Sequence, residues 1–250
     1  KELAGRFTDL TLSPDGRTAV VHGHGEGTGV DVGNTVAFVD LDEPNAGPRS
    51  VALSDSSGRA MESFAFPQPG DGSRRLVLAR GTDAFSLIEL DHLERDPIEI
   101  PVKLPSDSRF LAPGKILFRA DEIFVQLENS SDILVLQLVP DESRGPDGFR
   151  VAPLFLATGS TVLDFELIGE GGERRLVAVG PSSLSVVDPV TGAASSADVD
   201  ARFVDLMPFV GRSPVDDEPR ERGFLVQTKG RAIAFVDFVG QRAFSSQNVE

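Results

Sequence analysis

The 250-residue chain contains no cysteine, no tryptophan, no tyrosine and only three histidines. The lack of cysteine excludes disulfide bonds, thiolate metal ligands and cysteine nucleophiles. The lack of Tyr and Trp leaves aromatic packing to 17 phenylalanines. Tyr and Trp carry the polar group that favours interfaces, so their absence also disfavours a site that holds a sugar by stacking.

Basic charge is scarce, with 24 Lys and Arg against 39 Asp and Glu, a net charge of −15 and an isoelectric point near 4.6. A field of this sign repels nucleic acids and anionic membrane surfaces, so we expect no nucleic-acid partner. No apolar run reaches 18 residues, so no transmembrane segment is expected. The first six residues lack the apolar core of a signal peptide. Because the chain begins with Lys, we expect a removed upstream signal or anchor and a periplasmic or extracellular bacterial protein.

A short apolar segment recurs five times along the chain. Its copies occupy residues 35–41, 84–90, 133–138, 184–189 and 233–238. A polar marker residue stands near the end of each copy: Asp40, Glu89, Gln137, Asp188 and Asp237. The markers follow one another at intervals of 48 to 51 positions. Such a regular spacing predicts an array of similar supersecondary units.

Both faces of the repeated segment are apolar. Four positions before the marker stand Val36, Phe85, Ile133, Leu184 and Ile233, and two before it stand Phe38, Leu87, Val135, Val186 and Phe235. One position before the marker, on the opposite face of a strand, stand Val39, Ile88, Leu136, Val187 and Val236. A strand that is apolar on both faces needs a layer on each side. Five such sheets can meet this need in a radial stack, which predicts an all-β propeller.

The markers stand where the strands end. Short polar side chains at such positions accept hydrogen bonds from the backbone N–H groups of the following turn. We therefore interpret the marker as a turn cap, and prefer this to a ring of acids that binds a ligand.

The turn Ser13-Pro14-Asp15-Gly16-Arg17, followed by a strand and then by the first repeated segment, resembles the YVTN-type β-propeller repeat. Residues 184–192 resemble it as well. The likeness extends at lower stringency over all five repeats. It is weakest in the third repeat, where Arg119-Ala120-Asp121-Glu122 replaces the first turn. The resemblance implies blades of four antiparallel strands, and because such propellers serve many roles it says little about function.

A single propeller domain over residues 1–250 is expected, with blades at about 7–53, 61–104, 111–157, 162–199 and 203–246. In the second blade the expected strands are 62–66, 75–80, 84–90 and 98–103. The chain forms either a closed five-bladed ring, which we favour, or part of a larger propeller. Exposed sheet faces and edges in a truncated stack would favour aggregation.

The one metal candidate is His22, His24 and Glu26, in a glycine-rich loop after an expected strand. Residues two apart on an extended backbone point the same way, so two imidazoles and a carboxylate can surround Zn²⁺. The alternative is a solvated loop, because no more distant ligand is evident. In blades of the resembled family this loop lies on the face of the inter-blade connectors, where ligands usually bind.

Other site patterns are weaker. The acids Asp198, Asp200 and Asp205, and the acids at 216–218, lack the ordered ligand spacing of a calcium loop, and the second group continues into a mixed-charge run typical of a solvated loop. The glycine-rich loop precedes a strand rather than a helix, so it is not a phosphate loop. No Gly-x-Ser-x-Gly motif is present. Two carboxylates of a glycosidase could still face each other across a channel.

These patterns favour a non-catalytic binding or protein-interaction module, with a protein or small ligand on the connector face or along the channel, and no cofactor. The alternative is a propeller hydrolase or lactonase with a channel-facing, metal-assisted site. A catalytic propeller would gather titratable groups with shifted pKa values in one pocket, whereas a binding module would scatter them.

Overall fold

The computed structural model describes residues 9–22, 35–43, 45–53, 63–70, 72–81, 84–101, 113–169 and 174–198, and the backbone of four further strands within 205–248. Of those last four strands, only the side chains of Leu206 and Met207 are described. Apart from one 3₁₀ turn, η1 (Glu142–Arg144), the described elements are all β-strands. Among the described residues, no helix has the length and apolar character to cross a membrane.

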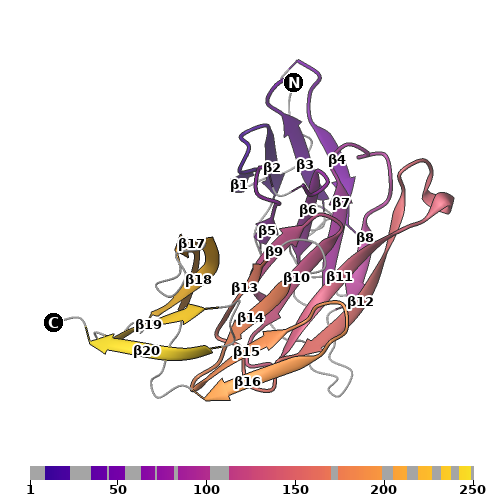
Figure 1. Cartoon of the computed structure of the whole chain (residues 1–250). Coiled ribbons are helices and arrows are strands. Elements are labelled where there is room, and N and C mark those ends of the chain that lie inside the picture. Colours follow the sequence, from indigo (N-terminus) through magenta and orange to yellow (C-terminus); the bar gives the residue numbers. More distant parts are fainter. Residues whose placement is uncertain are drawn as a thin grey trace. The chain divides into compact units, whose positions relative to one another are not determined.

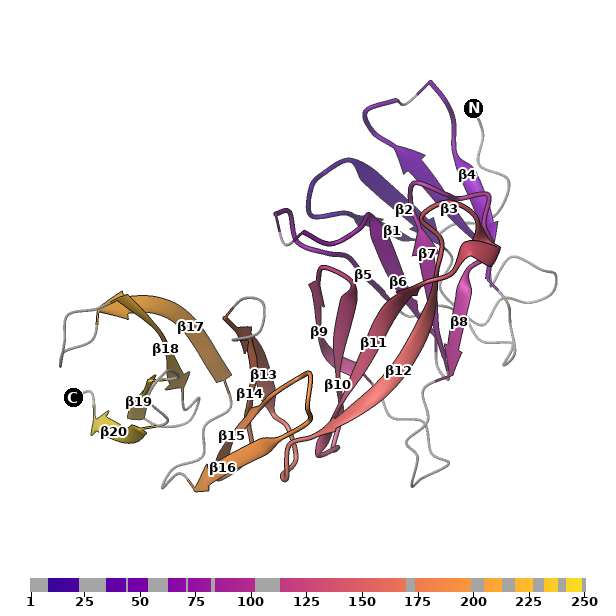
Figure 2. The same ribbon diagram turned by 45° about the vertical axis from the view of Figure 1, so that its right-hand side comes forward.

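The strands form five four-stranded sheets, each a meander in which neighbours in sequence are neighbours in the sheet (Figures 1 and 2). The first two sheets contain β1 (Asp9–Leu12), β2 (Thr18–His22), β3 (Thr35–Asp40) and β4 (Arg49–Ala52), then β5 (Ser63–Ala65), β6 (Leu76–Arg80), β7 (Ala84–Glu89) and β8 (Ile98–Pro101). The third contains β9 (Pro113–Arg119), β10 (Glu122–Leu127), β11 (Asp132–Pro140) and β12 (Phe149–Ala157). The last two contain β13 (Asp164–Ile168), β14 (Arg175–Val179), β15 (Ser183–Val187) and β16 (Ala194–Asp198), then β17 (Asp205–Arg212), β18 (Pro219–Val226), β19 (Ala232–Asp237) and β20 (Arg242–Asn248). The predicted all-β class and four-stranded antiparallel sheets are confirmed.

The chain divides into two compact units, and the third sheet contributes to both. The first unit comprises Lys1–Ala112, Ile116–Ile123 and Leu136–Pro153. The second comprises Pro113–Lys115, Phe124–Val135 and Leu154–Glu250. The single-domain organisation of residues 1–250, with the blade boundaries given above, stays a prediction.

The two middle strands of each of the first four sheets are largely buried, as the repeat predicts. All five residues of β2 and the last five of β7 are buried. Between the first two sheets, Val20, Val36 and Phe38 pack with Val77 and Ile88 in one cluster of buried side chains. The outer strands are more exposed, most of all β16, in which all five residues are exposed.

The marker residues divide into two groups. Asp40 Oδ1 accepts the N–H groups of residues 42 and 43, and Asp188 Oδ1 accepts those of residues 190 and 191, so the turn-cap interpretation is correct for these two. It is wrong for Glu89 and Gln137. Gln137 donates to Glu122 Oε1, and Glu89 enters an ion pair instead. The side chain of Asp237 lies outside the described residues.

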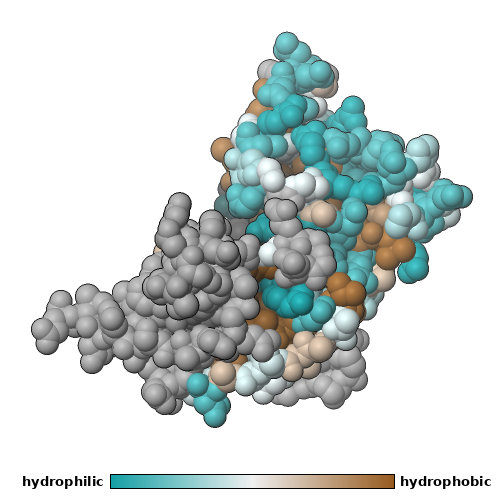
Figure 3. Space-filling model, in the orientation of Figure 1, coloured by the Kyte–Doolittle hydropathy of each residue, from teal (hydrophilic) through white to brown (hydrophobic). Residues whose placement is uncertain are grey.

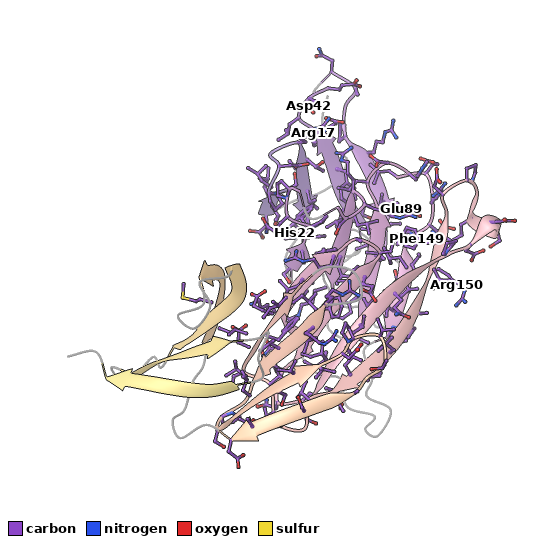
Figure 4. The ribbon with its side chains drawn as sticks, in the orientation of Figure 1. Arg17, His22, Asp42, Glu89, Phe149 and Arg150 are labelled. Carbon is purple, nitrogen blue, oxygen red and sulfur yellow. The ribbon has the colours of Figure 1, made fainter. Side chains whose placement is uncertain are left out.

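Glu89 joins the second sheet to the loop between β11 and β12, within the first unit (Figure 4). Its carboxylate, 8% exposed, accepts a 2.7 Å hydrogen bond from Arg95 and lies 3.8 Å from Arg144 Nη2. Arg95 also donates to the carbonyl of Pro146, and Arg144 donates to the carbonyl of Asp96. A buried carboxylate needs such partners, and this requirement overrides the turn-cap role.

The loop itself depends on Gly148. A Cβ atom at this position would lie 2.7 Å from the Cβ of Arg144 and 2.9 Å from the carbonyl oxygen of Asp141. The Gly148 carbonyl also accepts the N–H of Asp141 at 2.8 Å, which closes the loop. The backbone therefore cannot move aside freely to admit a side chain.

We expect Gly148→Ala to lower the free energy of unfolding by about 1–3 kcal/mol, the usual range for an overpacked site. Gly72→Ala is the matched control for the loss of a glycine, because nothing lies within 4 Å of its Cβ and only its positive φ of 73° is strained. Urea denaturation measures both. If Gly148→Ala is no more destabilising than Gly72→Ala, the steric argument is wrong.

Candidate functional site

The described residues offer two places where functional groups gather: a pocket in the first unit and a charged cluster in the second. Of the predicted metal trio, His22 belongs to neither. His22 is buried at the end of β2, with its ring centroid 4.6 Å from that of Phe64 and Nε2 at 3.5 Å from Thr11 Oγ1. His24 and Glu26 lie outside the described residues, so the Zn²⁺ hypothesis stays a prediction. No group of three or more potential metal ligands occurs among the described residues.

The pocket has a volume of about 280 Å³. It lies between the β1–β2 turn and the segment that leads from β5 into β6. Its lining includes Pro14, Asp15, Phe66, Pro67, Pro69, Arg74, Arg75, Leu76 and Leu90. Prolines, phenylalanine and leucines thus form much of the wall, as is usual for sites that bind apolar groups.

Each charged side chain of the pocket has at least one hydrogen-bond partner. Asp15 Oδ1 accepts the Ser13 hydroxyl at 2.5 Å and the Arg17 N–H at 3.0 Å. Arg75 donates to Asp91 at 2.7 Å and to Thr18 Oγ1 at 3.2 Å. Arg74 donates to Asp121 at 3.1 Å. These bonds hold the charged side chains in place and leave the apolar wall to contact a ligand.

The pocket is not on the connector side of its sheets. In each meander the first turn and the third turn lie at one end, while the second turn and the link to the next sheet lie at the other. Asp15 belongs to the first turn of its sheet, and Pro69 and Arg74 belong to the first turn of the next. The ligand surface expected on the connector face therefore stays a prediction, and the pocket is a separate site.

The charged cluster joins the first strands of three sheets within the second unit. Lys115 in β9 donates from Nζ to Asp164 Oδ1 at 3.1 Å and to Glu166 Oε1. Both acids are in β13, two positions apart, so they share a face. The other oxygen of Asp164 accepts the N–H of Leu206 in β17 at 2.8 Å.

Lys115 is held as a cation. Burial by itself lowers its pKa, but the hydrogen bond to Glu166 and the charges of Glu166 and Asp164 outweigh that effect and raise the pKa above its ordinary value of 10.5. A lysine that acts as a nucleophile or base needs a lowered pKa. Lys115 therefore keeps its positive charge at neutral pH.

Sequence reasoning missed both places. The pocket combines residues of two different turns, and no single motif joins them. A signal for Asp164 was present, because Asp followed by a large apolar residue opens the first strand at Asp9-Leu10, Asp164-Phe165 and Asp205-Leu206. Read as a repeat, this pattern would have marked the start of the first strands.

Several solved structures match the chain. Dihydro-heme d1 dehydrogenase NirN in complex with DHE is 15% identical, with a TM-score of 0.59 over 96% of this chain and 46% of NirN. The Dos1 propeller is 11% identical, with a TM-score of 0.54 over 98% of this chain and 63% of that one. The WD40 domain of SCAP from fission yeast is 14% identical, with a TM-score of 0.50 over 97% of this chain and 52% of that one. The structure of the fission yeast SREBP–SCAP binding domains has the same identity and TM-score, over 98% of this chain and 60% of that one.

These likenesses, together with the five meanders, show that the chain has the β-propeller fold. The chain spans about half the length of the first structures that it matches. No protein-family model matches the sequence, and no curated protein matches it. The specific YVTN assignment thus stays a prediction.

Removing the cation from the charged cluster should destabilise the fold. We expect Lys115→Met to cost about 2 kcal/mol, below the ~3–5 kcal/mol of a fully buried pair because the Lys115 side chain is 29% exposed. The matched control is Arg17→Met, since the Arg17 and Asp42 side chains are 54% and 53% exposed and exposed pairs contribute little. Equal midpoints of urea unfolding for the two variants would contradict the structural role of Lys115.

The raised pKa of Lys115 also predicts a pH dependence. A base whose pKa is higher in the folded state stabilises the fold below its unfolded value, here 10.5, and this contribution disappears as pH rises through the folded pKa. The difference in melting temperature between wild type and Lys115→Met should therefore be constant from pH 7 to 9 and shrink above pH 10.5. Calorimetry across this range measures it, and a difference that grows with pH would refute the assigned direction.

Proposed function

We propose that the chain is a non-catalytic, protein-interaction propeller whose first-unit pocket accepts an apolar side chain of a partner. The observation that carries the proposal is the largely apolar wall of the pocket, and the direction of the pKa shifts agrees with it. The pKa values of Asp15, Glu94, Asp141 and Asp188 are lowered, and those of Arg17 and Lys115 are raised. Every one of these groups therefore keeps its charge at neutral pH.

The causes of these shifts are structural. The hydrogen bond from Ser13 and the Arg17 N–H lower the pKa of Asp15, and the N–H groups of Thr191 and Val190 lower that of Asp188. A general acid or base needs a pKa near the working pH, reached by shifts in the opposite direction. Moreover, the shifted groups among the described residues are distributed over the turns of several sheets and strand β9 instead of one pocket. Both features support recognition over catalysis, and no observation favours the hydrolase or lactonase alternative.

The size of the pocket indicates the kind of ligand. Pockets for drug-sized molecules usually measure ~300–1,000 Å³, whereas this one measures about 280 Å³. A pocket at the lower end of this range has room for one apolar side chain of a partner. A structural neighbour, the fission-yeast SCAP domain, occurs in a complex with SREBP, which agrees with a protein-binding role for the same fold.

The proposal is tested with N-acetyl-leucine amide as the probe. In ¹H–¹⁵N spectra of the ¹⁵N-labelled chain, the probe should shift the amide signals of Ser13, Gly70 and Leu76, which line the pocket. Leu90→Asn makes the apolar wall polar at nearly constant volume, and we expect it to weaken binding about tenfold, the loss typical of one buried apolar contact. Leu90→Met is the matched control and should retain binding.

Shifts that are absent from the pocket, or that Leu90→Asn leaves unchanged, would contradict the proposed site. Hydrolysis of a lactone or ester that Asp15→Asn abolishes would contradict the non-catalytic role. Melting curves of each variant confirm that the comparison is made between folded proteins.

A further inference from the structure

Arg74, which lines the pocket of the first unit, is held in place by three contacts with the third sheet. Its Nε donates to Asp121 Oδ1 at 3.1 Å, and its Nη1 donates to the carbonyl of Asp147 at 2.7 Å. Its guanidinium carbon lies 5.3 Å from the ring centroid of Phe149, the fully buried first residue of β12 (labelled in Figure 4). All three partners belong to the same compact unit as the pocket. The third sheet therefore fixes one wall of a pocket that the first two sheets form.

The guanidinium of Arg74 keeps one nitrogen for a ligand. Nε and Nη1 are engaged, whereas Nη2 donates to no group in the part of the chain that the structure describes, and the side chain is 37% exposed. Arg75, the other arginine of the pocket, has no such nitrogen, because Nη1 and Nη2 bond to Asp91 and Thr18 and Nε is buried. A side chain that is already held loses little further entropy when it bonds to a ligand. Arg74 is thus a pre-oriented donor beside an apolar wall.

The surroundings of Arg74 indicate which acceptor it suits. On the face in Figure 3 the described surface is mostly hydrophilic, in contrast to the apolar wall of the pocket. An apolar side chain that enters the pocket brings its flanking peptide groups with it, and a carbonyl buried there without a hydrogen bond is costly. Asp121 balances the charge of Arg74, and Asp15 adds a negative charge to the lining. A neutral carbonyl oxygen therefore suits Nη2 better than a carboxylate.

We propose that Arg74 orients the partner in the pocket by donating from Nη2 to the main-chain carbonyl next to the apolar side chain. Asp121 is a positioning residue, because it is not part of the pocket lining and acts by holding Arg74. Binding sites usually combine an apolar wall with a few fixed polar groups that set the orientation of the ligand. The inference rests on the function proposed above for the pocket and adds the group that fixes the partner's main chain.

The test measures the affinity for N-acetyl-leucine amide by ¹H–¹⁵N titration of the wild type and of Arg74→Met, which keeps an unbranched apolar stem. Because a hydrogen bond to a charged donor is lost, we expect binding to weaken at least tenfold. Arg74→Lys retains a charged donor and should recover part of this loss. In the wild type the probe should also shift the Nε–H signal of Arg74. N-acetyl-leucine, which carries a carboxylate in place of the amide, should bind no more tightly than the amide.

Asp121→Asn tests the positioning role and should weaken binding about threefold, since a released Arg74 must be ordered when the probe binds. Asp42→Asn is the matched control, because it also removes an exposed carboxylate paired with an arginine, here Arg17, which does not line the pocket. It should bind as the wild type does, and equal affinities of the two Asn variants would refute the role of Asp121.

Wild-type affinity in Arg74→Met, or tighter binding of N-acetyl-leucine than of its amide, would overturn this inference and leave the proposed pocket intact. A wild-type chain that does not bind the probe would overturn the proposed function and this inference together. Melting curves of the variants confirm that each is folded.

Discussion

The structure depends on the burial of its middle strands on both faces. Val20 and Val77 are fully buried, as is Phe85 in the repeated segment. Each such side chain contributes roughly 1.5–3 kcal/mol only when a neighbouring sheet covers it. A single sheet therefore cannot keep its fold alone, and stacking of sheets is the direct consequence of the sequence pattern. Because the strand interiors are committed to packing, polar chemistry is displaced to strand ends, turns and outer edges.

Where charge is nevertheless buried in the described part of the chain, it is paired. Glu89 is neutralised by Arg95, and Asp164 by Lys115. Lys115 and Asp164 come from strands of different sheets, and Arg144 reaches Glu89 from a distant loop, so the ion pairs connect elements as well as compensate charge. Desolvation makes such pairs a modest source of stability, but removing one partner leaves an unpaired buried charge, which is costly. The pairs thus act mainly to select one arrangement of neighbouring elements.

Much of the local structure could be predicted from the sequence. The strands expected at 62–66, 75–80 and 84–90 correspond to β5, β6 and β7 within one residue at each end. This accuracy follows from the short apolar segments and from turn residues with positive φ, such as Gly16 at 70°. The turn-cap roles of Asp40 and Asp188 were equally predictable, since they involve only the next three residues.

The sequence-based predictions that were wrong or missing concern contacts between different loops and turns. Glu89 has the same position in its repeat as Asp40, but two arginines from loops reach it, and its neighbours in the strand give no sign of this. The pocket likewise needs the β1–β2 turn of one sheet beside the first turn of the next. Sequence periodicity specifies which residues lie in a strand, whereas these sites depend on which loops meet, a property of the packed fold.

The same division bears on the binding role proposed above. Catalysis requires groups with unstable charge states held together in a site that excludes water. Here turns stabilise the charged forms of Asp15 and Asp188, two strand residues stabilise that of Lys115, and the sheets leave their outer strands in contact with solvent.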